Sequence, residues 1–290
     1  MLYIVIVNWN LEHDTIECIE SLTYAGVSLN QIILIDNGSG DDSTKSFKSR
    51  FNNELHLIIN DDNLGYVKAI NQGIQVALNH KADWILLLNN DTVVDEKFYQ
   101  EIQNYITDSD PFAIITPLIF YYSQPERIWN LGDHLIDGTL LTYNSYHGKT
   151  APVGLPKTIP VDFVSGCAMI IKSDVVEKIG MFDETLVMYG EEVDYCWRAR
   201  IAGYHAVCIT RSKVWHKVSK SADKVKPRSR YYKIRNQIIF YRRYSHGMQK
   251  VFLFVFSILR SMTIIVRDIL QQKTELIPPL VKGWVDGWKQ

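Results

Sequence analysis

The chain has 290 residues, of which 47% are hydrophobic, so it can bury a sizeable core and is not globally disordered. Its formal net charge of -1 gives no general electrostatic argument for a nucleic-acid partner. The length allows one large α/β domain, or a core domain with an appendage. The four cysteines form no CxxC pair, which is typical of reduced, buried cysteines in a cytosolic protein. The first residues lack a basic region and a long apolar region, so they predict a strand and not a signal peptide.

Short apolar runs alternate with helical patterns over the first part of the chain. Strands are predicted at Leu2–Val7, Gln31–Ile35, Leu55–Ile59 and Trp84–Leu88, and helices at Asp14–Tyr24 and Val67–Leu78. Continuous apolar runs between helices indicate a largely parallel sheet that is covered on both faces. Each predicted strand that comes after the first helix has a cluster of polar residues at its carboxyl end. Ligands of open α/β sheets bind outside these ends, so the sequence predicts a site there.

The middle of the chain, from about residue 117 to residue 160, has a less regular pattern. It is rich in Tyr, Gly and Pro, and Leu131–Tyr143 is a candidate hairpin. Regular patterns return at Val161–Lys172. Helices are predicted at Asp174–Ile179 and Glu191–Ala202, and a further strand at Ala206–Ile209.

The composition becomes basic near the C-terminal third, where Asp223 is the only acid between Arg198 and Arg260. Val218–Arg230 is predicted to be a polar, basic loop, and Tyr231–Tyr244 a helix. The basic side chains from residue 213 to residue 235 have two functional interpretations: contact with the diphosphate of a bound ligand, or with anionic phosphates of a second substrate at a membrane surface. An ordinary solvated loop is the alternative.

Met248–Leu270 is a long apolar stretch that Arg260 interrupts. A helix that crosses a bilayer needs about 20 apolar residues with few charges. The arginine therefore favours a helix that lies at the membrane interface over one that spans the membrane. Packing within the protein or in a homodimer remains the alternative.

Ionisable residues lie at or near the predicted element boundaries: Asp36, Asp91, Glu191, Glu192, Asp194 and His216. Mg²⁺ and Mn²⁺ bind carboxylate oxygens together with substrate phosphates. A metal that bridges a diphosphate neutralises charge on a leaving group. A single carboxylate after a strand is weaker evidence, because many such acids only cap the next helix.

Several motifs in order resemble the inverting family 2 glycosyltransferases, which have the GT-A fold. They are IVIVNWN, LIDNGSGDDS, NDDNLGYVKAINQGI, ILLLNNDT, FVSGCAMIIKSDVVEKIGMFDE and MYGEEVDYCWRARIAGYHAVCITRSKVWH. The resemblance runs from Leu2 to about His216. It implies an α/β fold with a Rossmann-like, mostly parallel sheet between helices. We therefore expect a catalytic domain at residues 1–220, with a nucleotide-sugar half (1–115) and an acceptor half (116–220). The basic and apolar pattern after it predicts a C-terminal helical extension, a membrane-associating region at residues 221–290.

The resemblance also implies where the nucleotide-sugar donor binds. The matching positions at the base and ribose are Val7, Asn8, Trp9 and Asp36, and those that flank the base and diphosphate are Asn63, Gly65 and Asn71. A carboxylate such as Asp36 can accept the imide N–H of uracil or thymine. The alternative for Asp36 is an Asx turn with the two residues that follow it.

Asn89-Asn90-Asp91 resembles the Asp-x-Asp metal motif of the family, with asparagine in place of the first acid. Asn89 offers only a neutral oxygen, so Asp91 is expected to hold the Mn²⁺ or Mg²⁺ ion, and more weakly than two acids would. His216 matches the histidine that completes this site in many members. A structural histidine is the alternative.

Glu192 matches the catalytic base that removes the acceptor proton, and its neighbour Glu191 is the alternative because the usual pattern here is Glu-Asp. A helix N-terminus favours the ionised form that a base needs. Asp194 matches an acid that orients the acceptor. The alternative for Asp194 is an ion pair with Arg198 one helical turn later.

These positions together predict inverting transfer of a hexose or deoxyhexose from a UDP- or dTDP-sugar to a glycan or lipid-linked glycan acceptor, in cell-surface polysaccharide biosynthesis. LLLNNDT and MYGEEVDYCWRAR most resemble rhamnosyltransferases. The expected location is the cytoplasmic face of the cell membrane. A dinucleotide oxidoreductase is disfavoured because Asn8-Trp9-Asn10 lacks the glycine-rich turn. A catalytically inactive nucleotide-binding or scaffold protein of the same fold remains the rival function.

Overall fold

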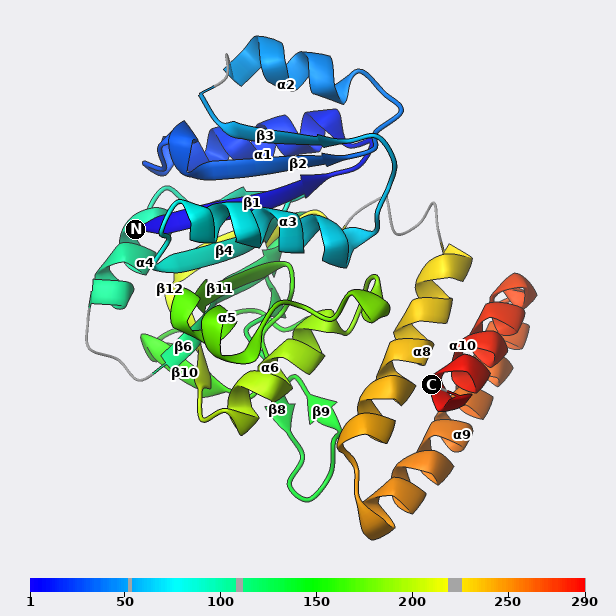
Figure 1. Cartoon of the computed structure of the whole chain (residues 1–290). Helices are drawn as coiled ribbons and strands as arrows, with labels where there is room; N and C mark the ends of the chain where they lie inside the picture. Colours follow the sequence, from blue (N-terminus) through cyan, green and yellow to red (C-terminus); the bar gives the residue numbers. More distant parts are fainter. Residues whose placement is uncertain (52–53, 108–111, 219–225, 290) are drawn as a thin grey trace.

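The computed structural model describes residues 1–51, 54–107, 112–218 and 226–289. Figure 1 shows a central sheet with helices on both faces and three C-terminal helices side by side at one edge of the molecule. The strands are β1 (Leu2–Asn8), β2 (Ile32–Asn37), β3 (His56–Asn60), β4 (Trp84–Asn89), β5 (Thr92–Val94), β6 (Phe112–Tyr121), β7 (Gln124–Asn130), β8 (His134–Leu135), β9 (Thr142–Tyr143), β10 (Thr158–Val161), β11 (Ala168–Lys172) and β12 (His205–His216). The α-helices are α1 (Glu12–Tyr24), α2 (Ser43–Phe51), α3 (Tyr66–Asn79), α4 (Phe98–Thr107), α5 (Ser173–Ile179), α6 (Glu191–Ile201), α8 (Lys226–Tyr244), α9 (Gly247–Leu270) and α10 (Ile277–Lys289).

The main sheet has the strand order β10-β12-β6-β11-β4-β1-β2-β3, with β5 on β12 and β7 on β6. The strands β3, β2, β1 and β4 run parallel, and β12 is parallel to β6. The strand β11 runs antiparallel between β4 and β6. The expected α/β fold with a mostly parallel sheet is therefore confirmed, and the reversed β11 joins its two parallel groups.

Alternate residues of the parallel strands enter two separate cores. Tyr3 and Val5 of β1 pack in the core beneath α3, whereas Ile4 and Ile6 pack in the core beneath α1. Burial of an isoleucine or valine side chain contributes about 1.5–3 kcal/mol. Because both faces of the strand are buried, the sequence shows a continuous apolar run and no alternation with polar residues.

Several predicted elements differ from the structure. The strand predicted at Ala206–Ile209 continues to His216, because Arg211 and Lys213 point outward while their neighbours stay buried. The loop prediction for Val218–Arg230 is wrong at its end, since α8 begins at Lys226. Pro227 fits the first turn of a helix, where its missing N–H has no intrahelical acceptor. The rest of that prediction, residues 219–225, lies outside the described residues.

The candidate hairpin at Leu131–Tyr143 is present as the pair β8 and β9. The predicted boundary between two halves at residues 115 and 116 falls inside β6, so both halves share one sheet. The predicted boundary at residues 220 and 221 lies in a segment that the structure does not describe.

The C-terminal extension is helical, as expected, and α8 joins it to the core. The ring of Phe240 on α8 lies 5.8 Å from that of Trp197 on α6, centroid to centroid. The helix α10 packs so closely on α8 that a Cβ atom at Gly283 would lie 2.5 Å from the Tyr231 carbonyl oxygen. None of the helices in the described part of the chain is long and apolar enough to cross a membrane.

Candidate active site

A pocket of about 460 Å³ lies at the carboxyl ends of β1, β2 and β4. This volume is within the range of about 300–1,000 Å³ that is usual for small-molecule sites. Ten of the residues singled out in the sequence line it: Val7, Trp9, Asn63, Gly65, Asn89, Asn90, Asp91, Glu191, Glu192 and His216. The remaining four, Asn8, Asp36, Asn71 and Asp194, do not line it.

Asp91 and His216 form one wall of the pocket. The long strand β12 pairs with β5 so that His216 lies opposite Thr92, which brings the imidazole to the end of β4. His216 Nε2 lies 3.2 Å from Asp91 Oδ1, and the side chains are only 8% and 4% exposed. Burial lowers the pKa of His216, but the neighbouring Cys167 and Asp91 raise it more, to about 10 overall. In this geometry the imidazole donates a hydrogen bond from Nε2 to Asp91 Oδ1.

One buried polar atom of the pocket, Glu191 Oε2, has no hydrogen-bond partner among the residues that the structure describes. Buried polar atoms nearly always have a partner, so this atom points to a group supplied from outside the chain. One carboxylate and one imidazole suit Mn²⁺, and a cation at the imidazole would displace its proton. Asp91 and His216 fit a divalent cation whose remaining ligands come from a bound phosphate group.

A second set of possible metal ligands, His13, Asp14 and Glu17, lies on α1. Lys217 Nζ donates hydrogen bonds to both carboxylates of this set. The ammonium group already neutralises the two acids, so this set does not need a metal ion.

Glu191 and Glu192 begin α6 and lie close to Gly166, where a Cβ atom would be 3.6 Å from Glu192 Cβ and 3.7 Å from Glu191 Oε1. The Glu192 Oε2 atom accepts a hydrogen bond of 3.0 Å from the Gly190 N–H. Burial, and then the charge of Glu192, raise the pKa of Glu191 well above its ordinary range. Burial also raises the pKa of Glu192, although the Gly190 N–H and the Lys233 cation oppose this rise. The environment therefore separates the two acids, and Glu192 ionises more readily.

The part of the pocket at the carboxyl ends of β2 and β3 is built from polar side chains. Asn63 Oδ1 accepts hydrogen bonds from Gly65 N at 2.9 Å and from Asn37 Nδ2 at 3.3 Å. Gly65 has a φ of +88°, which a residue with a side chain rarely adopts. These contacts fix the turn that leads into α3 beside the pocket.

Asn8 and Asp36 lie behind the pocket wall in a buried polar network. Asn8 Nδ2 donates to Asp36 Oδ2 at 2.9 Å, and Ser39 N donates to Asp36 Oδ1 at 3.0 Å. The second bond reaches the third residue after Asp36, one residue further than in the Asx turn that was the alternative for this side chain. Asn90 lines the pocket and also joins this network, through Thr15 Oγ1 at 2.8 Å.

Asn71 and Asp194 hold neighbouring segments in place. Asn71 exchanges hydrogen bonds with the backbone of Phe182, at 3.0 and 3.2 Å. Asp194 is 2% exposed and accepts a hydrogen bond of 2.8 Å from Arg198 Nε, which is the ion pair that the helical spacing allowed.

Several pocket residues were not assigned a specific role from the sequence, and four of them add an aromatic or charged side chain: Tyr66, Trp129, Arg228 and Lys233. The Tyr66 hydroxyl lies 3.4 Å from Asn89 Oδ1, and the Trp129 ring meets His216 edge-on at 4.6 Å. Trp129 lies on β7, in the irregular middle of the sequence, where no pattern fixes the strand register. The two cations belong to the basic stretch, but only the fold of α8 brings them to the pocket.

The profile of glycosyl transferase family 2 matches residues 3–180, more than half of the chain. The chain belongs to this family. It is 28% identical over 294 residues to the low-salt glycan biosynthesis hexosyltransferase Agl10 of Haloferax volcanii, with coverage of 99% of this chain and 90% of that protein. It is 26% identical over 198 residues to a poly-beta-1,6-N-acetyl-D-glucosamine synthase of Staphylococcus aureus, with coverage of 67% of this chain but only 44% of the synthase.

Solved structures show the same fold. The mannosyltransferase PcManGT from Pyrobaculum calidifontis, in complex with GDP-Man and Mn²⁺, superposes with a TM-score of 0.61 at 8% identity, over 100% of this chain and 87% of that one. GalNAc-T7 with UDP, GalNAc and Mn²⁺ superposes with a TM-score of 0.58 at 17% identity, over 74% of this chain and 43% of that one. The GT-A expectation for the fold is therefore confirmed, and the chain is a glycosyltransferase by its family.

Proposed function

We propose that this chain transfers a sugar from a nucleotide-sugar donor to a glycan hydroxyl with inversion at the anomeric carbon. One observation carries the proposal: Glu192 and the pair Asp91 and His216 line a single pocket of about 460 Å³. Inversion requires a base on the face of the sugar opposite the leaving diphosphate. A pocket with a carboxylate base and a separate cation-binding pair has the two groups that this reaction needs.

Glu192 is the general base in this proposal. The acceptor hydroxyl gives its proton to Oε1 of Glu192 while its oxygen attacks the anomeric carbon, and Oε2 stays bonded to the Gly190 N–H. Glu191 holds its proton more tightly than Glu192 does, because burial and the charge of Glu192 raise its pKa well above its ordinary range. A neutral Glu191 can donate a hydrogen bond to a substrate oxygen, but it cannot take a proton.

Asp91 and His216 would hold a Mn²⁺ or Mg²⁺ ion, and this ion would supply positive charge to the leaving diphosphate. Asn89 is a neutral contact at the same strand end and already interacts with the Tyr66 hydroxyl. Arg228 and Lys233 add two cations to the pocket from α8. They suit phosphate oxygens, either of the donor or of a phosphate-linked acceptor.

The proposed donor is a UDP- or dTDP-sugar, and the proposed sugar is a hexose or a deoxyhexose such as rhamnose. The hexosyltransferase name of the archaeal relative supports the wider class of hexoses, and its role in glycan biosynthesis supports a glycan acceptor. Rhamnose has support only from the LLLNNDT and MYGEEVDYCWRAR motifs.

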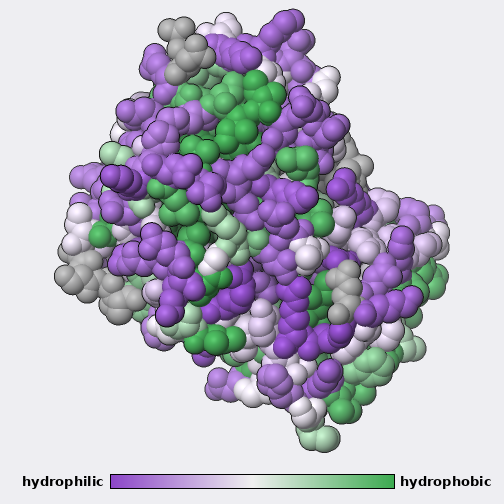
Figure 2. Space-filling view, viewed as in Figure 1, coloured by the Kyte–Doolittle hydropathy of each residue, from purple (hydrophilic) through white to green (hydrophobic). Residues whose placement is uncertain are grey.

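The protein is proposed to act at the inner face of the cell membrane, and α9 is the proposed contact. Seven apolar residues of α9 that are 47 to 80% exposed recur at alternating spacings of four and three: Met248, Phe252, Val255, Leu259, Met262, Val266 and Ile269. Hydrophobic surface gathers at the lower right of Figure 2, where Figure 1 places the C-terminal helices.

The charges of α9 favour a lipid surface as the partner of this face. Its exposed charged residues, Lys250, Arg260 and Arg267, are all basic, and its one acid, Asp268, is buried against Arg230. An apolar helix face bordered by basic residues binds anionic lipid interfaces. The spacing would also suit a homodimer seam, but the flanking positions Val251, Ile258 and Ile265 are apolar, whereas a coiled coil usually carries charges there.

A thermal-shift panel tests the proposed donor and the metal together. We expect UDP- or dTDP-sugars to raise the Tm in the presence of Mn²⁺ and GDP-sugars to have little effect, since a ligand that binds only the folded state stabilises it. Release of nucleoside diphosphate from the nucleotide-sugar that raises the Tm, with water taking the sugar, then tests turnover of the donor. Donor binding without any turnover would favour the rival, an inactive nucleotide-binding protein.

A further inference from the structure

The segment just before the proposed base has an unusual backbone. Val187 and Tyr189 have φ values of 63° and 65°, and Gly190 follows with 85°. Positive φ is unfavourable for a β-branched residue such as valine. Such residues persist only where the surrounding structure holds them in place. The segment Leu186–Gly190 therefore needs an external support to place Glu192.

Asn236 of α8 supplies that support from a position 2% exposed. Its Nδ2 atom donates to the carbonyl oxygens of Leu186, Met188 and Tyr189, at 2.7, 2.9 and 2.7 Å. A side-chain amide has two N–H groups, so the three acceptors share them. Its Oδ1 atom accepts a hydrogen bond of 2.8 Å from Arg235, which fixes the orientation of the amide.

The same segment also borders the part of the pocket at the carboxyl ends of β2 and β3. The carbonyl oxygen of Val187 accepts a hydrogen bond of 3.1 Å from Val67 N, at the start of α3. A Cβ atom at Gly65 would lie 3.1 Å from the Val187 side chain. A shift of the segment would therefore move the base relative to the donor wall.

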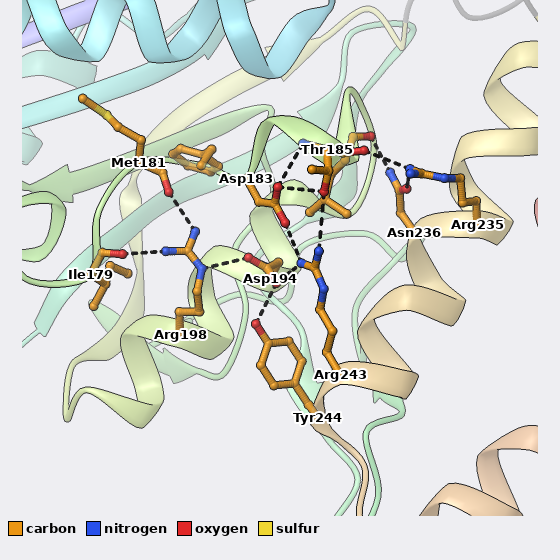
Figure 3. Close-up of polar contacts among 12 residues, drawn as sticks. Ile179, Met181, Asp183, Thr185, Asp194, Arg198, Arg235, Asn236, Arg243 and Tyr244 are labelled. Atoms are coloured by element: carbon orange, nitrogen blue, oxygen red, sulfur yellow. Dashed lines mark hydrogen bonds and ion pairs between the residues drawn. The ribbon is translucent and has the colours of Figure 1, made fainter. Parts of the chain in front are cut away.

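A second set of contacts from α8 holds α6 just after the base. Asp194 Oδ1 accepts a hydrogen bond of 2.8 Å from the Tyr244 hydroxyl. Arg243 lies 2.6 Å from Asp183 Oδ2 and 3.4 Å from Asp194 Oδ1, so it bridges the two acids. Figure 3 shows Arg243 between Asp183 and Asp194, with Tyr244 beside it. Asn236 lies about two turns earlier on the same helix, α8.

We infer that Asn236 and Tyr244 are positioning residues for the general base. They hold Glu192 from both sides, through the Leu186–Gly190 segment and through Asp194. The helix α8 lies beyond residues 3–180, where the family profile matches. In this chain the C-terminal extension is thus a part of the catalytic apparatus as well as an appendage. The inference rests on the proposed function, because it needs Glu192 to be the base.

The test compares Asn236→Ala and Tyr244→Phe with the unaltered full-length protein, using hydrolysis of the sugar donor that stabilises it most. In this assay water takes the place of the acceptor. We expect Asn236→Ala to lower kcat about 100-fold, which is the loss expected when a catalytic group is misplaced by about 1 Å. The donor Kd should stay within about twofold of its original value. Tyr244→Phe should lower kcat less, because it loses one hydroxyl and keeps its ring against Trp197. Gln237→Ala is the matched control on the same helix, since Gln237 contacts Arg260 and not the base segment.

The pH profile separates positioning from a loss of fold. The hydrogen bond from the Gly190 N–H lowers the pKa of Glu192. A displaced Glu192 loses this bond and its pKa rises, so the acid limb of kcat/KM should move to higher pH in Asn236→Ala. Wild-type kcat in both variants, or a parallel loss of kcat, donor affinity and Tm, would overturn the inference. If Asn236→Ala does not fold, Tyr244→Phe decides alone, and unchanged kcat there overturns it. An unaltered protein that turns over no sugar donor would overturn the proposed function, and this inference with it.

Discussion

His216 Nε2 lies 3.2 Å from Asp91 Oδ1 in the buried wall of the pocket, although β12 and β4 are far apart in the sequence. This contact makes Asp91 the only acid of the Asn89-Asn90-Asp91 strand end that can hold a cation together with the histidine. Asp91→Asn keeps the shape of the side chain but removes its charge. We expect this variant to lose the Mn²⁺-dependent rise in Tm that the donor produces.

Asp174→Asn is a control for that experiment, because Asp174 lies at the start of α5 and is paired with Lys172 on the surface. It should keep the full Mn²⁺ response. A normal Mn²⁺ response in Asp91→Asn would contradict the assignment of Asp91 as a metal ligand.

The division of roles between Glu191 and Glu192 can be measured directly. Glu192→Gln keeps the size of the side chain but cannot accept a proton, so we expect kcat to fall about 100- to 10,000-fold with the donor Kd nearly unchanged. Glu191→Gln should lose much less, because an amide can still donate a hydrogen bond from that position. The reverse order of the two losses would move the base to Glu191.

The environment of Glu192 predicts a pH dependence. Burial raises its pKa from the ordinary value of 4.5, and a base works only when it is ionised, so kcat/KM should fall as the pH falls through the raised pKa. Lys233 lowers this pKa, so Lys233→Met should move the acid limb to higher pH. Lys282→Met is the control, since Lys282 lies on α10 against Tyr231 and does not line the pocket. An acid limb that does not move in Lys233→Met would show that the two charges do not interact.

The first half of the fold could be predicted from the sequence because its strands are buried on both faces. Their apolar runs and the polar residues after them mark both the sheet and the edge where ligands bind. Asn63, Gly65 and Asp91 follow these strands and line the pocket, whereas Glu192, which also lines it, was assigned only from the family resemblance.

Contacts that depend on distant packing could not be predicted. Asp194 has an obvious partner one turn away, Arg198, and nothing local indicates that Arg243 and Tyr244 also reach it from α8. Asn236 lies in a basic, aromatic stretch, and its three carbonyl acceptors come from a segment about 50 residues earlier in the chain, as their separations show. Such contacts are set by how α8 docks on the core, which no local pattern records.

The exposed face of α9 predicts binding to anionic lipid vesicles. We expect the protein to sediment with vesicles of phosphatidylcholine and phosphatidylglycerol, less with phosphatidylcholine alone, and less at high salt, because salt screens the attraction of Lys250, Arg260 and Arg267. Leu259→Glu introduces a charge into the centre of the apolar face and should abolish sedimentation. A point substitution is preferable to removal of the C-terminal helices, because α10 packs tightly against α8 and its loss would disturb the fold. Tyr24→Glu is the control, since Tyr24 is 80% exposed on α1, away from that face. If Leu259→Glu instead splits a dimer in light scattering and leaves vesicle binding intact, the face is a seam between two copies of the chain.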